Sequence, residues 1–150
     1  MPRLLVVHHT PSPAMQALLE AVLEGARDPE LAEVEVVTRA ALAAGPVDVL
    51  AADAVLLGTP ANIGYMSGAL KHFFDLTYYP VLQETAGLPF GLWVHGQDDT
   101  AGAERSVLKV AGGLGWKQSA AVVSVTGDPS RDDLAACTEL GGTLAAVLFG

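Results

Sequence analysis

The sequence predicts a three-layer α/β fold, in which helices cover both faces of one parallel β-sheet. Short apolar segments that suit buried strands alternate along the chain with segments whose apolar residues recur at helical spacing. Hydrophobic residues make up 51% of the 150 residues and charged residues only 17%, which is enough apolar surface for a continuous core. We therefore expect one domain over residues 1–150.

Five segments are expected to form the strands of the sheet. The third is wholly apolar, which favours a central position, whereas the second carries Glu33 and Glu35, as expected of an edge strand. Because crossovers between parallel strands are right-handed, these features favour the strand order 2-1-3-4-5. The expected strands are residues 3–8, 33–38, 54–58, 90–95 and 120–125.

A helical segment is expected after each strand. Ser12 suits the N-cap of the first helix, and Ser130 with Asp133 matches a capping box at the start of the last. Residues 78–80 are expected to follow the third helix, where they would lie at a dimer contact. The helices are expected to begin near residues 14, 68, 101 and 130, and a short Ala-rich helical region precedes residue 53.

Three loops are expected to meet at the carboxyl ends of the strands, where strands 1 and 3 diverge. Residues 9–14 lead into a helix N-terminus, whose free amides and dipole favour an anion. Residues 59–67 are long for such a loop and are typical of a functional one. Residues 95–100 include Gly96, which permits close approach of a ligand. Each loop also has a structural interpretation, as a helix cap, a lid over the core or a capped turn.

Composition excludes several other classes of protein. The formal net charge of −9 argues against nucleic-acid binding. No apolar run reaches the roughly 18 residues of a membrane span, and the N-terminus lacks signal-peptide features, so we expect a cytoplasmic protein without membrane contact. Cys137 is the only cysteine, and no metal-ligand spacing of histidines is present, so we expect no metal. The GxGxxG, P-loop and GxSxG motifs and a receiver-type acidic cluster are also missing.

One segment resembles a known family. The run 58–60, followed by Gly64, the run 66–68, and then Lys71 with Phe74 and Asp75, is similar to the flavodoxin-fold reductases. Within that group it resembles NADPH-dependent FMN reductases and the NAD(P)H:quinone oxidoreductases called tryptophan-repressor-binding proteins. The resemblance implies a flavodoxin-like fold, FMN as cofactor, NADH or NADPH as electron donor, a small-molecule redox substrate and a homodimer or homotetramer.

The resemblance also implies which residues hold FMN. The first loop would bind the phosphate, the second would border the isoalloxazine ring, and the third would face its other edge and the ribityl chain. The chemistry would take place on the flavin, without a catalytic side chain. The implied cofactor-binding residues are His9, Thr10, Ser12, Ala14, Met15, Thr59, Pro60, Ala61, Asn62, Ile63, Gly64, Tyr65, His95, Gly96, Gln97 and Asp98.

Two other functions stay open at this point. One is a flavodoxin-like electron carrier. The other is a non-enzymatic module that binds a protein partner and has lost FMN. Pro11 and Pro13 remove amide donors from the phosphate loop, and Asp98 and Asp99 bring negative charge to the third loop. These features favour the non-enzymatic alternative.

Overall fold

The computed structural model describes residues 1–149, and within them it contains seven strands and five α-helices. The strands are β1 (Arg3–His8), β2 (Glu35–Ala40), β3 (Ala54–Asn62), β4 (Tyr65–Met66), β5 (Pro89–Gly96), β6 (Lys117–Gln118) and β7 (Val123–Thr126). The α-helices are α1 (Pro13–Ala26), α2 (Pro46–Leu50), α3 (Gly68–Val81), α4 (Ala101–Gly113) and α5 (Arg131–Leu148), and two short 3-10 helices are η1 (Pro29–Leu31) and η2 (Ala41–Ala43).

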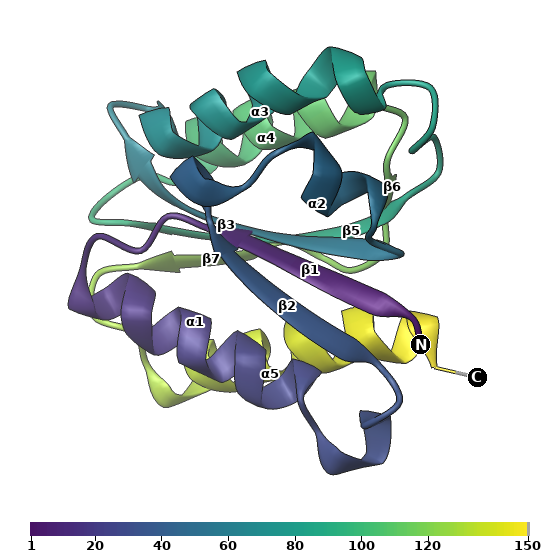
Figure 1. Cartoon of the computed structure of the whole chain (residues 1–150). Coiled ribbons are helices and arrows are strands. Elements are labelled where there is room, and N and C mark those ends of the chain that lie inside the picture. The colour runs from purple at the N-terminus through teal and green to yellow at the C-terminus, as the bar shows by residue number, and fades with distance from the viewer. Residues whose placement is uncertain (150) are drawn as a thin grey trace.

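The elements form three layers, with α2, α3 and α4 on one face of the sheet and α1 and α5 on the other (Figure 1). Each face has its own apolar core. Alternating side chains of a strand supply the two cores in turn, so that Leu5 and Val7 of β1 face α3 and α4, whereas Leu4 and Val6 face α1 and α5. None of the helices described over residues 1–149 is long and apolar enough to cross a membrane.

The sheet confirms the expected fold class. Its order is β2-β1-β3-β5-β6, and all these neighbours are parallel. It differs from a plain five-stranded sheet in two places. The fifth position is divided between β6 and β7, which both pair with β5, and β4 pairs antiparallel with β3. The expected strict alternation of five strands with five helices is therefore too simple.

Several local predictions are confirmed. The first strand has the expected bounds, Ser12 caps α1 through a 3.2 Å bond from Met15 N, and Ser130 and Asp133 form the capping box of α5. Lys71 and Asp75 pair one turn apart on α3. The second strand begins two residues later than expected, at Glu35, because residues 31–34 complete the turn after η1.

The largest correction concerns residues 59–67, which were expected to form a loop. β3 instead continues through Asn62, the chain turns at Ile63 and Gly64, and β4 returns antiparallel, so this segment is a β-hairpin. Pro60 is tolerated in the strand because, like Gly58, it faces the side of β1, and the ladder between β1 and β3 ends at Gly58, so no bond from residue 60 is required.

Two further expectations are wrong. Residues 78–80 do not follow the third helix but form its last turns, and Pro80 lies inside α3. The fifth strand does not run over residues 120–125. Its main part is Val123–Thr126, because the preceding residues leave the ladder after β6.

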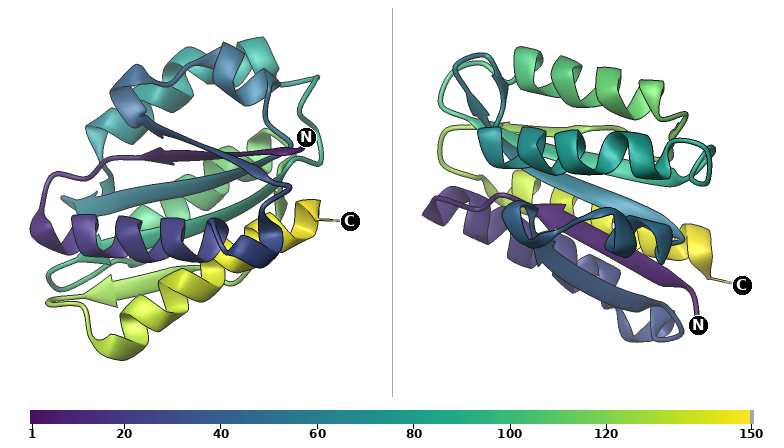
Figure 2. Two further views of the ribbon diagram at one scale, coloured as in Figure 1. Left: turned by 60° about the horizontal axis from the view of Figure 1, so that its bottom comes forward. Right: turned by 45° about the horizontal axis from the view of Figure 1, so that its top comes forward.

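Two glycines allow α1 and α5 to lie directly against each other below the sheet (Figure 2). A Cβ on Gly25 would overlap the carbonyl oxygen of Thr138, and a Cβ on Gly141 would overlap that of Val22. The two backbones therefore meet at a point where only glycine fits. This contact holds the C-terminal turns of α1 against α5.

Candidate functional site

The three expected loops do meet at one edge of the sheet. The strands β1, β3 and β5 run parallel, so their carboxyl ends lie together. His9 N donates a 3.0 Å bond to Gly58 O, which joins the first loop to β3, and a Cβ on Gly96 would lie 3.3 Å from the Cβ of Ala61. The candidate site is this edge.

A fourth segment, which the sequence reasoning missed, belongs to the same edge. The turn after β7 is joined to the end of β5, because Gly127 N donates a 2.9 Å bond to Gly96 O. Gly127 has a φ of 69°, a conformation that favours glycine. Gly127, followed by Asp128 and Pro129, was the only turn signal in this part of the sequence.

The first loop presents hydroxyl groups beside the N-terminus of α1. Ser12 Oγ accepts the Met15 amide, and Thr10 Oγ1 lies 2.7 Å from His8 Nδ1. The Ser12 hydroxyl accepts a bond and still has its own proton to donate to a ligand. Thr10 also has a free proton when His8 Nδ1 carries the ring hydrogen and donates to it. The Met15 amide already donates to Ser12, and the Met15 side chain is fully buried. The Ala14 amide lies in the first turn of α1, where amides have no acceptor within the helix.

The two histidines of this loop differ. Burial, and then the neighbouring His9, lower the pKa of His8 below its usual value of 6.5, so His8 is neutral at pH 7. His9 Nδ1 is buried and makes no hydrogen bond within the described residues. A buried polar atom without a partner is unusual, and Thr77 Oγ1 and Trp93 Nε1 in the core are in the same situation. His9 Nδ1 lies in the loop expected to hold the phosphate.

At the base of the hairpin, the Thr59 hydroxyl makes its hydrogen bonds within the protein. Thr59 and Pro60 are buried, and Thr59 Oγ1 donates to Pro60 O over 2.8 Å while it accepts from Ser67 N over 3.0 Å. Ser67 in turn caps α3, since its Oγ accepts from Leu70 N. Thr59 therefore positions the hairpin. The sequence did not indicate that the Thr59 hydroxyl and Ser67 hold the hairpin and the start of α3 in place.

The tip of the hairpin exposes apolar atoms. Ile63 is completely exposed, at 105% of its reference area, and Tyr65 is 43% exposed. Ile63 also has a φ of 50° and Gly64 a φ of 72°. A β-branched residue in this left-handed region is strained, and such strain tends to persist at functional sites. Asn62, beside them, is exposed as well, whereas Ala61 is half-buried.

The hairpin is held against α4. Met66 N donates a 3.1 Å bond to Ser106 Oγ, which itself donates to Ala103 O. Next to this bond, a Cβ on Gly102 would overlap the carbonyl oxygen of Gly64. The tip therefore has a fixed place beside the first turn of α4.

The third loop divides into a buried and an exposed part. His95 and Gly96 are buried, and His95 Nε2 donates a 2.7 Å bond to Gly127 O. Gln97 and Asp98 are exposed and face solvent at the edge. Asp99, just before the N-cap of α4, accepts a 2.9 Å bond from Ala101 N through Oδ1.

The site is an open edge. Five surface hollows of about 260–670 Å³ lie against α1, α3, α4, α5 and β2, and none of these five is lined by the three loops. The residues present nevertheless fit FMN. The first loop offers two hydroxyl protons, an unpaired imidazole nitrogen and the positive end of a helix for a phosphate, and the hairpin offers exposed apolar side chains for a flat ring.

Comparison with known proteins decides the family. Residues 29–128, which include β2, β3, the hairpin, β5 and α4, match the family described as NADPH-dependent FMN reductase. The chain belongs to the NADPH-dependent FMN reductase family. A flavodoxin from Aquifex aeolicus is 37% identical over 75 residues, which are 50% of this chain and 40% of that protein. The chain thus matches less than half the length of this relative.

Solved structures show the same fold. An archaeal flavodoxin superposes with a TM-score of 0.81 at 18% identity, covering 97% of this chain and 98% of that one. A flavodoxin described as a WrbA-like protein, from Agrobacterium tumefaciens, gives 0.77 at 23% identity, covering 98% and 97%. The rubredoxin oxygen:oxidoreductase of Desulfovibrio gigas gives 0.81 at 15% identity, covering 97% of this chain and 36% of that one. These likenesses establish the flavodoxin-like architecture.

Proposed function

We propose that this protein binds FMN at the carboxyl edge of its sheet and transfers electrons from NADH or NADPH to a small redox substrate. Membership of the NADPH-dependent FMN reductase family supports both parts. The observation that carries the cofactor assignment is the exposed, strained hairpin tip opposite a capped helix N-terminus, both fixed to the same sheet edge.

The phosphate of FMN would be held by the first loop. The Thr10 and Ser12 hydroxyls donate to it, the Ala14 amide adds a donor, and the dipole of α1 favours its charge. For Thr10 to donate outward, the His8 Nδ1–H must donate to Thr10 Oγ1, which selects the Nδ1–H tautomer of the neutral ring. His9 Nδ1 gains its missing partner in the same place.

The isoalloxazine ring would lie between the hairpin and the third loop. Ile63 and Tyr65 pack against the ring, and the backbone of residues 61–64 and of residues 96–98 supplies hydrogen bonds to its polar edge. When bound, FMN supplies the capacity to accept a hydride or single electrons. Gln97 and Asp98 leave the remaining side of the ring open, which suits access of a donor and an acceptor.

A flavodoxin-like electron carrier is the second candidate. The similarity to the flavodoxin of Aquifex aeolicus favours it. The net charge of −9 also suits a protein that meets basic redox partners. The two candidates share the FMN site and differ in whether NAD(P)H reduces the flavin directly.

Phosphate recognition is tested by comparing FMN with riboflavin, which lacks the phosphate. Replacement of Thr10 by Val should weaken FMN binding about tenfold, since a hydrogen bond to a charged group is worth roughly 1.5–3 kcal/mol. Riboflavin binding should not change. Thr38→Val, on the edge strand β2 and outside the three loops, is the matched control. Equal affinity for the two flavins in the parent protein would overturn the phosphate assignment.

Oxidation of NADPH or NADH separates the two candidates. The FMN-loaded protein with a quinone or free flavin as acceptor should consume the reduced nucleotide, seen as a loss of absorbance at about 340 nm. Loss of this activity in Ile63→Ser, with Thr38→Val unaffected, would place it at the edge site. A protein that binds FMN and oxidises neither nucleotide is an electron carrier.

A further inference from the structure

The outer edge of the sheet at β7 has unpaired backbone groups. Within residues 1–149, β7 pairs with β5 and with no other strand. Gly127 N donates inward to Gly96 O, and amides alternate in direction along a strand, so those of Val125 and Val123 also point toward β5. The N–H and C=O groups of Ser124 and Thr126 therefore point away from the sheet.

This edge lacks the charged residues found at the opposite one. β2, the other edge strand, carries Glu35, which pairs with Arg3, and also Arg39, and charges of this kind discourage further pairing. β7 has the sequence Val-Ser-Val-Thr, without a charged residue or a proline. A strand of this composition is a template for pairing with another chain.

A groove of about 540 Å³ runs beside this edge on the side of α5. Phe90 pairs with Gln118 and Trp93 with Val123, and Ser119 N still donates to Phe90 O, so residues 120–122 bulge out of the ladder. These three residues form one wall of the groove. The small side chains of Ala121 and Ala136 leave room for a ligand's side chains. Asp133 and Glu139 are the charged residues of the lining, which contains no lysine or arginine.

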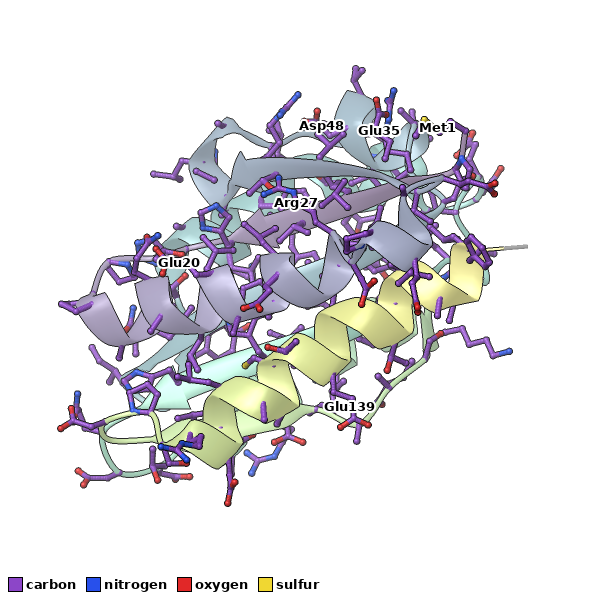
Figure 3. The ribbon with its side chains drawn as sticks, turned by 90° about the horizontal axis from the view of Figure 1, so that it is seen from below. Met1, Glu20, Arg27, Glu35, Asp48 and Glu139 are labelled. Carbon is purple, nitrogen blue, oxygen red and sulfur yellow. The ribbon has the colours of Figure 1, made fainter. Side chains whose placement is uncertain are left out.

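Glu139 is well placed to meet a bound segment. Figure 3 shows it on α5, on the side of the helix turned away from α1, where its side chain extends toward the outer edge of the sheet. It has no ion-pair partner among residues 1–149. Asp133 accepts the Ser130 amide through Oδ2, which leaves Oδ1 available. The groove is therefore acidic and has unpaired charge.

On its other face, the same edge borders α4. Ser124 Oγ donates a 3.2 Å bond to Glu104 Oε2, and Glu104 lines a second, shallow hollow together with Leu108 and Lys109. A strand added to β7 would send alternate side chains to these two surfaces. Every second side chain of the added strand would face Asp133 and Glu139 beside α5, and the side chains between them would face Leu108 on α4.

We propose that the β7 edge binds an extended segment of a partner protein as an additional strand, with basic and apolar residues in alternation. The basic side chains pair with Asp133 and Glu139, the apolar ones pack toward Leu108, and the backbone pairs with Ser124 and Thr126. A second copy of this chain suits the edge less well, because it would bring a second acidic α5 surface to the site. This inference does not depend on FMN.

The test uses a fluorescein-labelled peptide of alternating lysine and leucine, with fluorescence anisotropy as the readout. Ser124→Pro removes an outward N–H without removing a bond to β5, so the strand tolerates it. We expect that variant to bind the peptide at least tenfold more weakly. Ser124→Ala is the matched control, since it also loses the bond to Glu104 but keeps the amide, and it should bind like the parent. Circular dichroism verifies that both variants fold.

Glu139→Lys provides a second variant that leaves the backbone of β7 intact. This variant should bind the lysine–leucine peptide at least tenfold more weakly than the parent protein, and it should bind a glutamate–leucine peptide. Amide NMR signals of Ser124 and Thr126 should shift on peptide addition. The proposal is overturned if a peptide of the same composition with lysines and leucines in blocks binds equally well, if Ser124→Pro has no effect, or if the protein self-associates through this edge instead.

Discussion

The backbone N–H of Met66 and the hydroxyl oxygen of Ser106 are joined by a 3.1 Å hydrogen bond that spans 40 positions of the sequence. This bond is buried and connects the returning strand of the hairpin to the middle of α4. Together with the contact between Gly64 and Gly102, it sets the position of the hairpin tip. The shape of the candidate site therefore depends on α4 as much as on the hairpin itself.

Ser106→Ala should destabilise the protein by about 1–3 kcal/mol, because it leaves the buried Met66 N–H without a partner. Urea unfolding measures the change. Ser119→Ala removes only a hydroxyl near the surface, which bonds to Lys117 O, and should change stability little. Equal effects of the two substitutions would show that the hairpin does not depend on this bond.

Ile63→Asn should stabilise the protein and weaken FMN binding. Asn tolerates the left-handed conformation that costs Ile roughly 1 kcal/mol, and Asn-Gly is the preferred pair for a two-residue hairpin turn. The fully exposed Ile63 side chain loses no core contacts when it is replaced. Thermal unfolding and flavin titration measure the two effects. A variant that binds FMN as well as the parent would contradict a role of Ile63 at the ring.

Gly141→Ala should destabilise the protein by about 3 kcal/mol or more, because its Cβ would overlap the carbonyl oxygen of Val22 in α1. The adjacent Gly142→Ala is the control. Its Cβ would lie 3.6 Å from Gly25 O, an ordinary contact, so the higher helix propensity of Ala should stabilise α5 by up to about 1 kcal/mol. Opposite signs in chemical denaturation are the expected result, and matching signs would refute the close packing of α1 on α5.

The stability of the protein should fall as the pH decreases below about 6.5, in part through His8. Its pKa is lowered in the folded state, chiefly by burial, so the unfolded chain binds more protons between the folded pKa and the usual value. Stability is therefore lost as the pH falls through this window. His8→Gln should reduce this pH dependence. An NMR titration of the His8 ring that gives a pKa at or above 6.5 would contradict this account.

The cysteine should be inert. Burial, and then the charge of Asp133, raise the pKa of Cys137 to about 12, and its side chain lies in the core between α5 and the sheet. A thiol reagent should leave the native protein unlabelled at pH 8 and label it in denaturant. Rapid labelling of the folded chain would mean that α5 does not cover this position.

The elements that were predicted correctly are those specified by nearby residues. Ser12 with Pro13 marks the start of α1, and Ser130 with Asp133 marks that of α5, because the caps are formed within a few residues. The apolar residues of β1 and of the first part of β3 have one possible location, inside the sheet. Once these strands are known to be parallel, the strand order also predicts that the carboxyl ends of β1, β3 and β5 lie together.

The elements that were missed depend on residues far apart in the chain. Thr59, Pro60 and Asn62 have the composition of a loop, yet Ser106 and the neighbouring strand β5 hold them in a hairpin. Pro80 favours a helix end, but it lies on an exposed part of α3, where the missing bond is tolerated. At the site, the sequence located the three segments but not the internal partners of Thr10 and Thr59.

Titration of FMN fluorescence with the purified protein tests whether the carboxyl edge of the sheet binds a flavin. We predict that the emission is quenched to a plateau at one FMN per chain, that riboflavin binds more weakly, and that Thr10→Val reduces this difference about tenfold. If FMN emission stays unchanged in a large excess of folded protein, the carboxyl edge does not form a flavin site, and the proposed function is wrong.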